Sequence, residues 1–210
     1  MTLLPDFIHL RWLRPGLSAS ERALGLAILS PAEITRADSD SFVAGRMLLR
    51  TLAGEILGIE AQAVPLSATC PDCGGPHGQP RIAGLAVSLS RCATAVVAVA
   101  ALKGSVGVDV EPRQGSAERA AAIMEVAGPG SIRAIQRWTS VEAALKADGR
   151  GLRLDPRNVG VTADRATLGD ARYELWHPEP APDLQVTVAW RASAPAGHID
   201  SAIVVAMSAG

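Results

Sequence analysis

The order of the expected elements constrains the fold more than any other feature of this sequence. A strand, a group of helices and a group of strands follow one another twice, with the change-over near Lys103–Gly104. Because helices and strands come in separate groups, this order predicts an α+β fold. No sequence repeat is strong enough to prove duplication. We nevertheless expect two similar lobes, residues 1–104 and 105–210.

Capping signals predict where the helices begin and end. Two capping boxes, Ser18–Glu21 and Ser30–Glu33, predict two helix starts, and the helix after the second box is expected to stop near Gly58. A helical pattern returns over residues 117–147 and is broken at Gly128–Gly130.

Apolar and alternating stretches predict the strands. Residues 70–80 are so rich in turn residues that we expect only a loop there. The short links Arg91–Ala93 and Lys103–Gly104 predict that the strands they join are antiparallel neighbours. The predicted strands are residues 7–12, 85–90, 94–102, 106–111, 159–162, 172–176, 184–190 and 201–207.

Composition excludes several classes of function. The formal net charge of -1 argues against a nucleic-acid-binding face. No apolar run approaches the roughly 20 residues that cross a bilayer, and the opening residues do not resemble a secretory signal. Three cysteines fit a reducing compartment better than a disulfide framework. We therefore expect a cytoplasmic protein without nucleic-acid or membrane partners.

Two carboxylates lie at alternate positions of the strand Gly107–Pro112. Asp109 and Glu111 are expected on one face, about 6–7 Å apart, where they repel each other. A hard divalent cation such as Mg²⁺ would relieve that repulsion and leave room for phosphate. The alternative is an exposed strand end with two solvated acids.

Trp138, Glu142 and Lys146 are spaced four residues apart and therefore share one face of a predicted helix. Lys146 is one of only two lysines among the 20 Lys and Arg residues, the other being Lys103. The alternative is an ordinary Glu–Lys surface pair, although the neighbouring apolar residues predict that most of this helix is buried.

Arg46 interrupts an apolar stripe at helical spacing formed by Phe42, Leu49, Ala53 and Ile56. An arginine in such a stripe needs a partner, either a protein carboxylate or a ligand phosphate.

Cys70, Cys73 and His77 have spacing that raises the possibility of zinc. A structural zinc site needs four ligands, and the chain has no second paired set. Cys92 is available as a fourth ligand, but nothing in its spacing requires that role. Buried or surface thiols are the alternative.

These segments together resemble the 4′-phosphopantetheinyl transferase superfamily, in its larger two-lobed type that activates polyketide and nonribosomal peptide synthases. The likeness covers about residues 40–152 as a series of motifs in order. They comprise Phe42, Arg46 and Arg50, then the turn Pro76–Pro80, then Ser90-Arg91-Cys92, then Gly107, Asp109 and Glu111 followed by Trp138, Glu142, Lys146 and Gly149.

The resemblance implies a fold of two similar α+β lobes with coenzyme A in the cleft between them. It implies Mg²⁺ held by Asp109, Glu111 and Glu142, and transfer of 4′-phosphopantetheine to a serine of an apo acyl or peptidyl carrier protein. Catalytic roles fall to Glu142, Lys146 and Asp109, and the protein is expected to be a monomer. The implied coenzyme A contacts are Arg46, His77, Gln79, Pro80, Ser90, Arg91 and Lys146.

Some positions depart from the family pattern. Val141 replaces a lysine, so we expect a lost phosphate contact and tighter coenzyme binding in a Val141→Lys variant. Arg91 and Cys92 replace a histidine and a serine, and Gln79 replaces a basic residue. These changes keep two alternatives open: a non-catalytic homologue that binds coenzyme A or a carrier protein, and a Mg²⁺-dependent pyrophosphate hydrolase.

Overall fold

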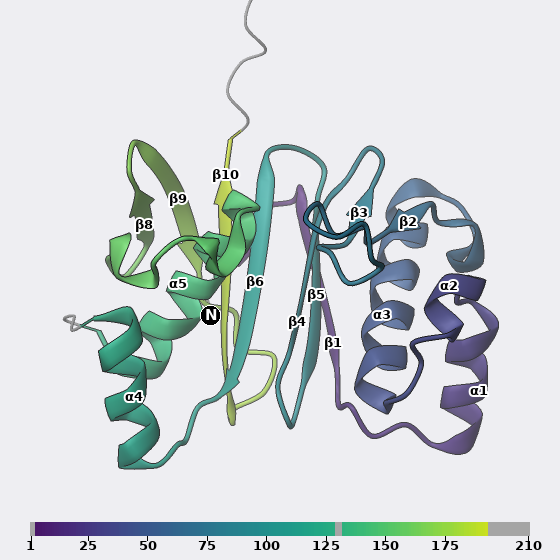
Figure 1. Ribbon diagram of the computed structural model, residues 1–210, viewed down its shortest axis with the longest axis horizontal. Coiled ribbons are helices and arrows are strands. Elements are labelled where there is room, and N and C mark those ends of the chain that lie inside the picture. Colours follow the sequence, from purple (N-terminus) through teal and green to yellow (C-terminus); the bar gives the residue numbers. More distant parts are fainter. Residues whose placement is uncertain (1–2, 129–131, 193–210) are drawn as a thin grey trace, which may run out of the picture.

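The computed structural model describes residues 3–128 and 132–192 and is a mixed α+β fold (Figure 1). Its helices are α1 (Ala19–Ala27), α2 (Pro31–Ile34), α3 (Asp40–Leu57), α4 (Ala117–Ala127) and α5 (Ala134–Asp148), with short 3-10 turns at Ala61–Ala63, Gly151–Arg153 and Pro156–Asn158. Its strands are β1 (Ile8–Leu13), β2 (Leu66–Ser67), β3 (Arg81–Ile82), β4 (Ala86–Arg91), β5 (Val96–Ala101), β6 (Ser105–Pro112), β7 (Val159–Val161), β8 (Arg165–Leu168), β9 (Ala171–Trp176) and β10 (Leu184–Arg191).

Two antiparallel sheets form the centre of the molecule. One has the strand order β1-β5-β4 and the other β6-β10-β9-β8-β7, while β2 and β3 make a small separate ribbon. In Figure 1, α3, α1 and α2 lie on one side of the strands and α4 and α5 on the other. The order across the molecule is therefore helices, sheet, sheet, helices.

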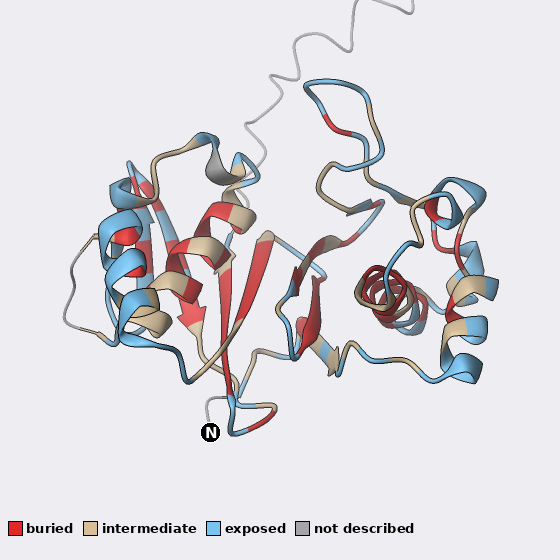
Figure 2. Cartoon of the chain, turned by 60° about the horizontal axis from the view of Figure 1, so that its bottom comes forward, coloured by how far each residue is buried: buried red, intermediate tan, exposed pale blue. Residues whose placement is uncertain are grey.

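Three apolar cores hold these layers together. One lies between α3 and the first sheet, a second between the two sheets, and a third between α5 and the strands β7–β10. Figure 2 shows the buried residues gathered in the central strands and along α3 and α5. The middle core is made largely of Val and Ala from β5, β6 and β10, so the sheets can pack closely.

The two sheets also meet along β4 and β6, which lie side by side without a regular backbone ladder. The Val108 N–H donates to Ser88 Oγ over 3.2 Å, and the Val110 N–H donates to Ser90 Oγ over 3.3 Å. Serine hydroxyls thus satisfy backbone donors that would otherwise be buried without a partner.

The capping predictions are confirmed for α1 and only in part for the next helix. Ser18 and Glu21 form the expected capping box. The box at Ser30 opens only the four-residue α2, and the long helix α3 begins separately, with Ser39 as its N-cap. That helix ends as predicted at Gly58, whose φ of 68° is the left-handed conformation that glycine favours.

The strand predictions are largely confirmed, with two differences. The sequence did not predict the two-residue strands β2 and β3, nor β8, whose four residues alternate between exposed and buried. It was also wrong about Lys103–Gly104, because β5 and β6 do not pair and instead belong to different sheets. The predicted strand at residues 201–207 and the Pro129–Gly130 part of the helix break lie outside the described residues.

Within residues 3–128 and 132–192, none of the helices combines the length and the apolar character that crossing a membrane requires.

Candidate functional site

The candidate site is built where α5 lies against β6, and Gly107 sets the distance between them. A Cβ atom added at Gly107 would stand 2.0 Å from the Ala143 carbonyl oxygen and 2.5 Å from the Ala147 nitrogen. Only glycine permits this approach of helix backbone to strand. The glycine of the predicted carboxylate strand therefore positions the helix that carries Glu142 and Lys146.

Lys146, Asp109 and Ser90 form one hydrogen-bonded cluster from three elements. The Lys146 ammonium donates to Asp109 Oδ1 over 2.6 Å and to Ser90 Oγ over 3.1 Å. Ser90 in turn donates to the same Asp109 oxygen over 2.7 Å. Three of the residues predicted for the site are thus brought into contact across β4, β6 and α5.

The second carboxylate oxygen of Asp109 has no partner. Asp109 is only 5% exposed, and its Oδ2 is buried without a hydrogen bond. A buried unpaired carboxylate oxygen costs free energy unless a cation or a donor reaches it. Of the atoms in this cluster, Asp109 Oδ2 is the one best placed to bind a cation that prefers oxygen ligands.

Glu142 lies in the same electrostatic environment. Burial raises the pKa of its carboxyl, and the charges of Asp109 and Glu111 raise it further, while Lys146 lowers it. Glu111 forms an ion pair with Arg119 on α4. Three carboxylates therefore gather near one lysine, which is an excess of negative charge that a divalent cation would neutralise.

The three carboxylates are not close enough together to act as one set of metal ligands. In the described part of the chain, the oxygens of Asp109, Glu111 and Glu142 do not all approach within 4.8 Å of one another. Lys146 occupies one oxygen of Asp109, and Arg119 holds Glu111. Asp109 Oδ2 thus remains open to a cation, whereas Glu111 would have to leave Arg119 first.

Three arginines surround the ring of Phe42. The guanidinium carbons of Arg36 and Arg46 each lie 5.4 Å from the ring centre, and that of Arg91 lies 6.0 Å away. Arg46 is buried, and its Nη1 has no hydrogen-bond partner. Burial is the largest cause that lowers the Arg46 pKa, and the neighbouring arginines add to it. This concentration of positive charge favours an anion.

Arg46 and Arg50 differ in how closely each contacts Glu33. Arg50 donates to Glu33 Oε2 from two nitrogens, at 2.7 and 3.0 Å, and to the Val64 carbonyl at 2.9 Å. Arg46 reaches the other oxygen of Glu33 only at 3.5 Å. Of the two partners that the sequence left open, the structure shows the protein carboxylate, at a long distance, and leaves Arg46 Nη1 without a hydrogen bond.

Two hollows lie beside these clusters. One, of about 450 Å³, is lined by Lys146, Gln79, Pro80 and His77 together with Ser88. The other, of about 240 Å³, is lined by Arg36, Phe42, Arg46 and Glu33 among others. Both are lined by Thr69. Five of the seven predicted coenzyme contacts thus line one or the other hollow, whereas Ser90 and Arg91 line neither.

The loop of residues 70–80 is tied to both halves of the chain. The Gln79 amide donates to the Lys146 carbonyl oxygen over 3.0 Å, at the C-terminal end of α5. Arg36 donates to the Pro76 carbonyl oxygen. His77 contacts Cys73, with Nε2 2.9 Å from Sγ. Gln79 therefore makes a positioning contact with the end of α5.

Sequence reasoning missed three polar residues of the site. Glu33 was identified only as a capping residue, Ser88 only as part of a strand, and Arg36 not at all. Arg36 and Ser88 belong to no motif, so their roles appear only when the chain is folded. For Glu33 the one available signal was its place in the Ser30–Glu33 capping box, which indicates a helix start and not a partner for arginines.

Val141 corrects one expectation. None of its surface is exposed (0%), and it belongs to the core between α5 and β7–β10. A lysine at this position would place its ammonium in that core. We therefore no longer expect Val141→Lys to tighten coenzyme binding, because the side chain at this position does not face the charged cluster.

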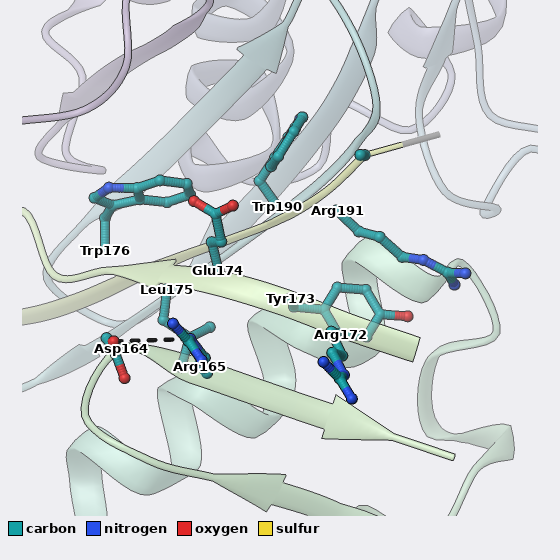
Figure 3. Close-up of a pocket in the computed structure, with 10 residues that line it drawn as sticks. Asp164, Arg165, Arg172, Tyr173, Glu174, Leu175, Trp176, Trp190 and Arg191 are labelled. Atoms are coloured by element: carbon teal, nitrogen blue, oxygen red, sulfur yellow. Dashed lines mark ion pairs between the residues drawn. The ribbon is translucent and has the colours of Figure 1, made fainter. Parts of the chain in front are cut away.

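A separate hollow of about 790 Å³ lies over β8, β9 and β10 (Figure 3). Figure 3 shows Trp176, Glu174 and Trp190 standing on these strands, with Arg165 paired to Asp164. The Trp190 indole N–H already donates to the Lys103 carbonyl oxygen. None of the predicted site residues lines this hollow, so it does not belong to the site above.

Comparison of the chain with protein-family models and with curated proteins finds no match in either.

Proposed function

We propose that this protein is a 4′-phosphopantetheinyl transferase, which moves the pantetheine arm of coenzyme A to a serine of an apo carrier protein. The observation that carries this proposal is the buried, unpaired Oδ2 of Asp109 beside Lys146 and Glu142. That arrangement suits a cation and phosphate oxygens at one point, and the arginines around Phe42 offer a second phosphate site nearby.

The metal-binding residues of this proposal are Asp109, Glu142 and, once released from Arg119, Glu111. Mg²⁺ held there would neutralise negative charge on the pyrophosphate of coenzyme A. Ser90 and Lys146 hold Asp109 through its other oxygen, so Oδ2 keeps one orientation. This positioning is the contribution of the protein before any substrate binds.

The reaction needs a proton acceptor and positively charged groups that neutralise the charge of the phosphates. The carrier serine oxygen forms a bond to the β-phosphorus, and the bond from that phosphorus to the bridging oxygen breaks, which releases adenosine 3′,5′-bisphosphate. Glu142 accepts the serine proton, directly or through water, and Lys146 stabilises charge on the phosphoryl group. Arg46 and Arg91 hold the adenosine-side phosphates.

The proposal also includes the two-lobed arrangement, with residues 1–104 and 105–210 as the lobes. Three strands of each half follow the same order and pairing, β1-β5-β4 in one and β6-β10-β9 in the other. The first strand of each half precedes its helices, and a long helix covers each sheet. The hollow lined by Gln79 from one half and Lys146 from the other supports a coenzyme site between them. We further propose a cytoplasmic monomer whose partner is a carrier protein.

The test is intact-mass spectrometry of a panel of apo carrier proteins incubated with this protein, coenzyme A and Mg²⁺. We expect one carrier at least to gain one phosphopantetheine, and the gain to disappear with EDTA. Asp109→Asn should lower the rate by about 10²–10³-fold, the range for removing one charge-stabilising group. Asp170→Asn, at an exposed turn residue, is the matched control.

Other outcomes separate the remaining interpretations. Coenzyme A binding by calorimetry without transfer to any carrier would favour a non-catalytic homologue. Release of phosphopantetheine in the absence of a carrier would favour a hydrolase. Full activity of Asp109→Asn would refute the role given to Asp109.

A further inference from the structure

The loop that follows β2 is closed on itself by backbone hydrogen bonds. The Cys70 N–H donates to the Gly75 carbonyl over 2.7 Å, and the Gly74 N–H donates to the Cys70 carbonyl over 2.9 Å. The Gly78 N–H donates to the Ala68 carbonyl over 2.7 Å and closes the base of the loop. The chain therefore doubles back within about ten residues.

This closure brings three metal-binding side chains together. The sulfurs of Cys70 and Cys73 and a ring nitrogen of His77 all lie within 4.8 Å of one another. Cys73 Sγ and His77 Nε2 are 2.9 Å apart. Among residues 3–128 and 132–192, this is the one group of three such donors at that spacing.

Glycines make the cluster possible. A Cβ at Gly75 would lie 3.1 Å from the His77 ring and 3.2 Å from Cys73 Sγ, so a side chain would crowd both donors. A Cβ at Gly78 would lie 2.3 Å from the Thr69 carbonyl oxygen. Gly74 has a φ of 71°, which glycine adopts readily. The loop backbone is thus shaped around the two thiols and the ring.

One of the two sulfurs also has a backbone N–H directed at it. The Gly75 N–H points at Cys73 Sγ from 3.4 Å. N–H groups directed at sulfur stabilise its negative charge, and a deprotonated sulfur is the form that ligates a metal.

We propose that Cys70 Sγ, Cys73 Sγ and His77 Nε2 bind one Zn²⁺ ion. Thiolate and imidazole donors are the set that zinc prefers, and three protein ligands with solvent in the fourth position complete a tetrahedron. Cys73 and His77 are exposed, so water reaches that fourth position. The two thiols release their protons on binding, and no electron transfer is involved.

The bound ion lies on one wall of the candidate site. Cys70, His77 and Gly78 line the hollow of about 450 Å³, beside Gln79. A metal bound at the tip of the loop keeps this wall in place. Zinc binding does not depend on the transferase proposal, because its ligands are distinct from Asp109, Glu111 and Glu142.

The test measures bound metal directly, on the whole chain purified under reducing conditions. The protein is incubated with Zn²⁺, dialysed, and analysed for metal by mass spectrometry. A parallel titration with Co²⁺ follows the visible absorption of tetrahedral cobalt and the thiolate-to-cobalt charge-transfer band. We expect one ion per chain in the wild type.

Variants distinguish this site from non-specific binding. Cys73→Ser and His77→Ala should lose the ion and the tetrahedral cobalt spectrum, with unchanged circular dichroism showing that the chain still folds. Cys92→Ser is the matched control, because Cys92 lies next to Thr94 outside the cluster, and it should keep the ion. Absence of bound metal in the wild type, or retention of metal by Cys73→Ser, would overturn the proposal.

Discussion

Val141 and Glu142 are adjacent on α5 and lie in opposite surroundings. Val141 is enclosed in the core between α5 and β7–β10, whereas Glu142 faces Asp109, Glu111 and Lys146. One step along a helix turns the side chain by about 100°, so neighbours readily fall on different faces. A motif position therefore identifies a function only when its face of the helix is known.

Val141→Lys should reduce the free energy of unfolding by about 3–5 kcal/mol, the range for a buried charge without a partner. Val126→Lys is the control, because Val126 lies on α4 and is 46% exposed. Urea unfolding of both variants checks the prediction. Wild-type stability of Val141→Lys, together with tighter coenzyme A binding, would contradict this view of position 141.

His177 is a second residue whose surroundings decide its behaviour. Its Nε2–H donates to the Ala163 carbonyl over 2.8 Å, which leaves Nδ1 to accept from Thr187 Oγ1 at 3.0 Å. Burial lowers the pKa of His177 below its ordinary value of 6.5. His177 therefore binds a proton less readily in the folded chain than in the unfolded chain.

Stability should therefore fall as the pH drops below about 6.5 toward the lower folded-state pKa of His177. In His177→Gln, the loss of unfolding free energy between pH 7.5 and pH 5.5 should be smaller than in the wild type. His9→Gln, on β1, is the control. An equal loss in wild type and His177→Gln would show that other groups cause the acid sensitivity.

At the scale of elements, the position of α5 on β6 determines the site. The helix carries Glu142 and Lys146, and the strand carries Asp109 and Glu111, so their separation depends on how closely the two backbones pack. Gly107 sets that distance, since any side chain there would meet the backbone of Ala143. Packing and chemistry are linked at this one position.

Gly107→Ala should destabilise the protein by about 1–3 kcal/mol, the usual cost of overpacking. It should also reduce carrier-protein modification, because moving α5 outward draws Lys146 away from Asp109. Gly16→Ala is the control, since a Cβ there meets nothing within 4 Å. Thermal unfolding and the mass assay measure both effects, and an unchanged Gly107→Ala protein would refute the argument.

At the scale of the whole molecule, the two halves are joined by a shared core and by serine hydroxyls. The middle core contains residues of both sheets, including Val99 from β5, Val108 from β6 and Val188 from β10. Ser88 and Ser90 bind the backbone of β6. With so much buried surface in common, we expect the halves to unfold together.

Ser88→Ala should lower the free energy of unfolding by about 1–3 kcal/mol, because it leaves the Val108 N–H buried without a partner. A single transition should remain in urea unfolding followed by both fluorescence and circular dichroism. Ser67→Ala, on exposed β2, is the control. Two separated transitions in the wild type would show that the halves fold independently.

Local patterns predicted much of the fold. Hydroxyl N-caps and the left-handed glycine at Gly58 act on backbone within a few residues, so the start of α1 and the end of α3 could be predicted. Alternation along β6 predicted that Asp109 and Glu111 share a face. The apolar residues of β5 predicted a strand, and the structure shows that all of them are fully buried.

Local patterns in the chain are enough to give the type and extent of most elements, and the residues that can carry charge or bind metal. Which of these residues meet depends on the folded chain. It paired β6 with β10 and not with β5, placed Ser90 on Asp109, turned Val141 into the core and gathered Cys70, Cys73 and His77. The difference arises from the separation along the chain over which each interaction acts. Capping and periodicity act between near neighbours, whereas these contacts depend on apolar burial and charge pairing between residues far apart in the chain or brought back by a folded loop.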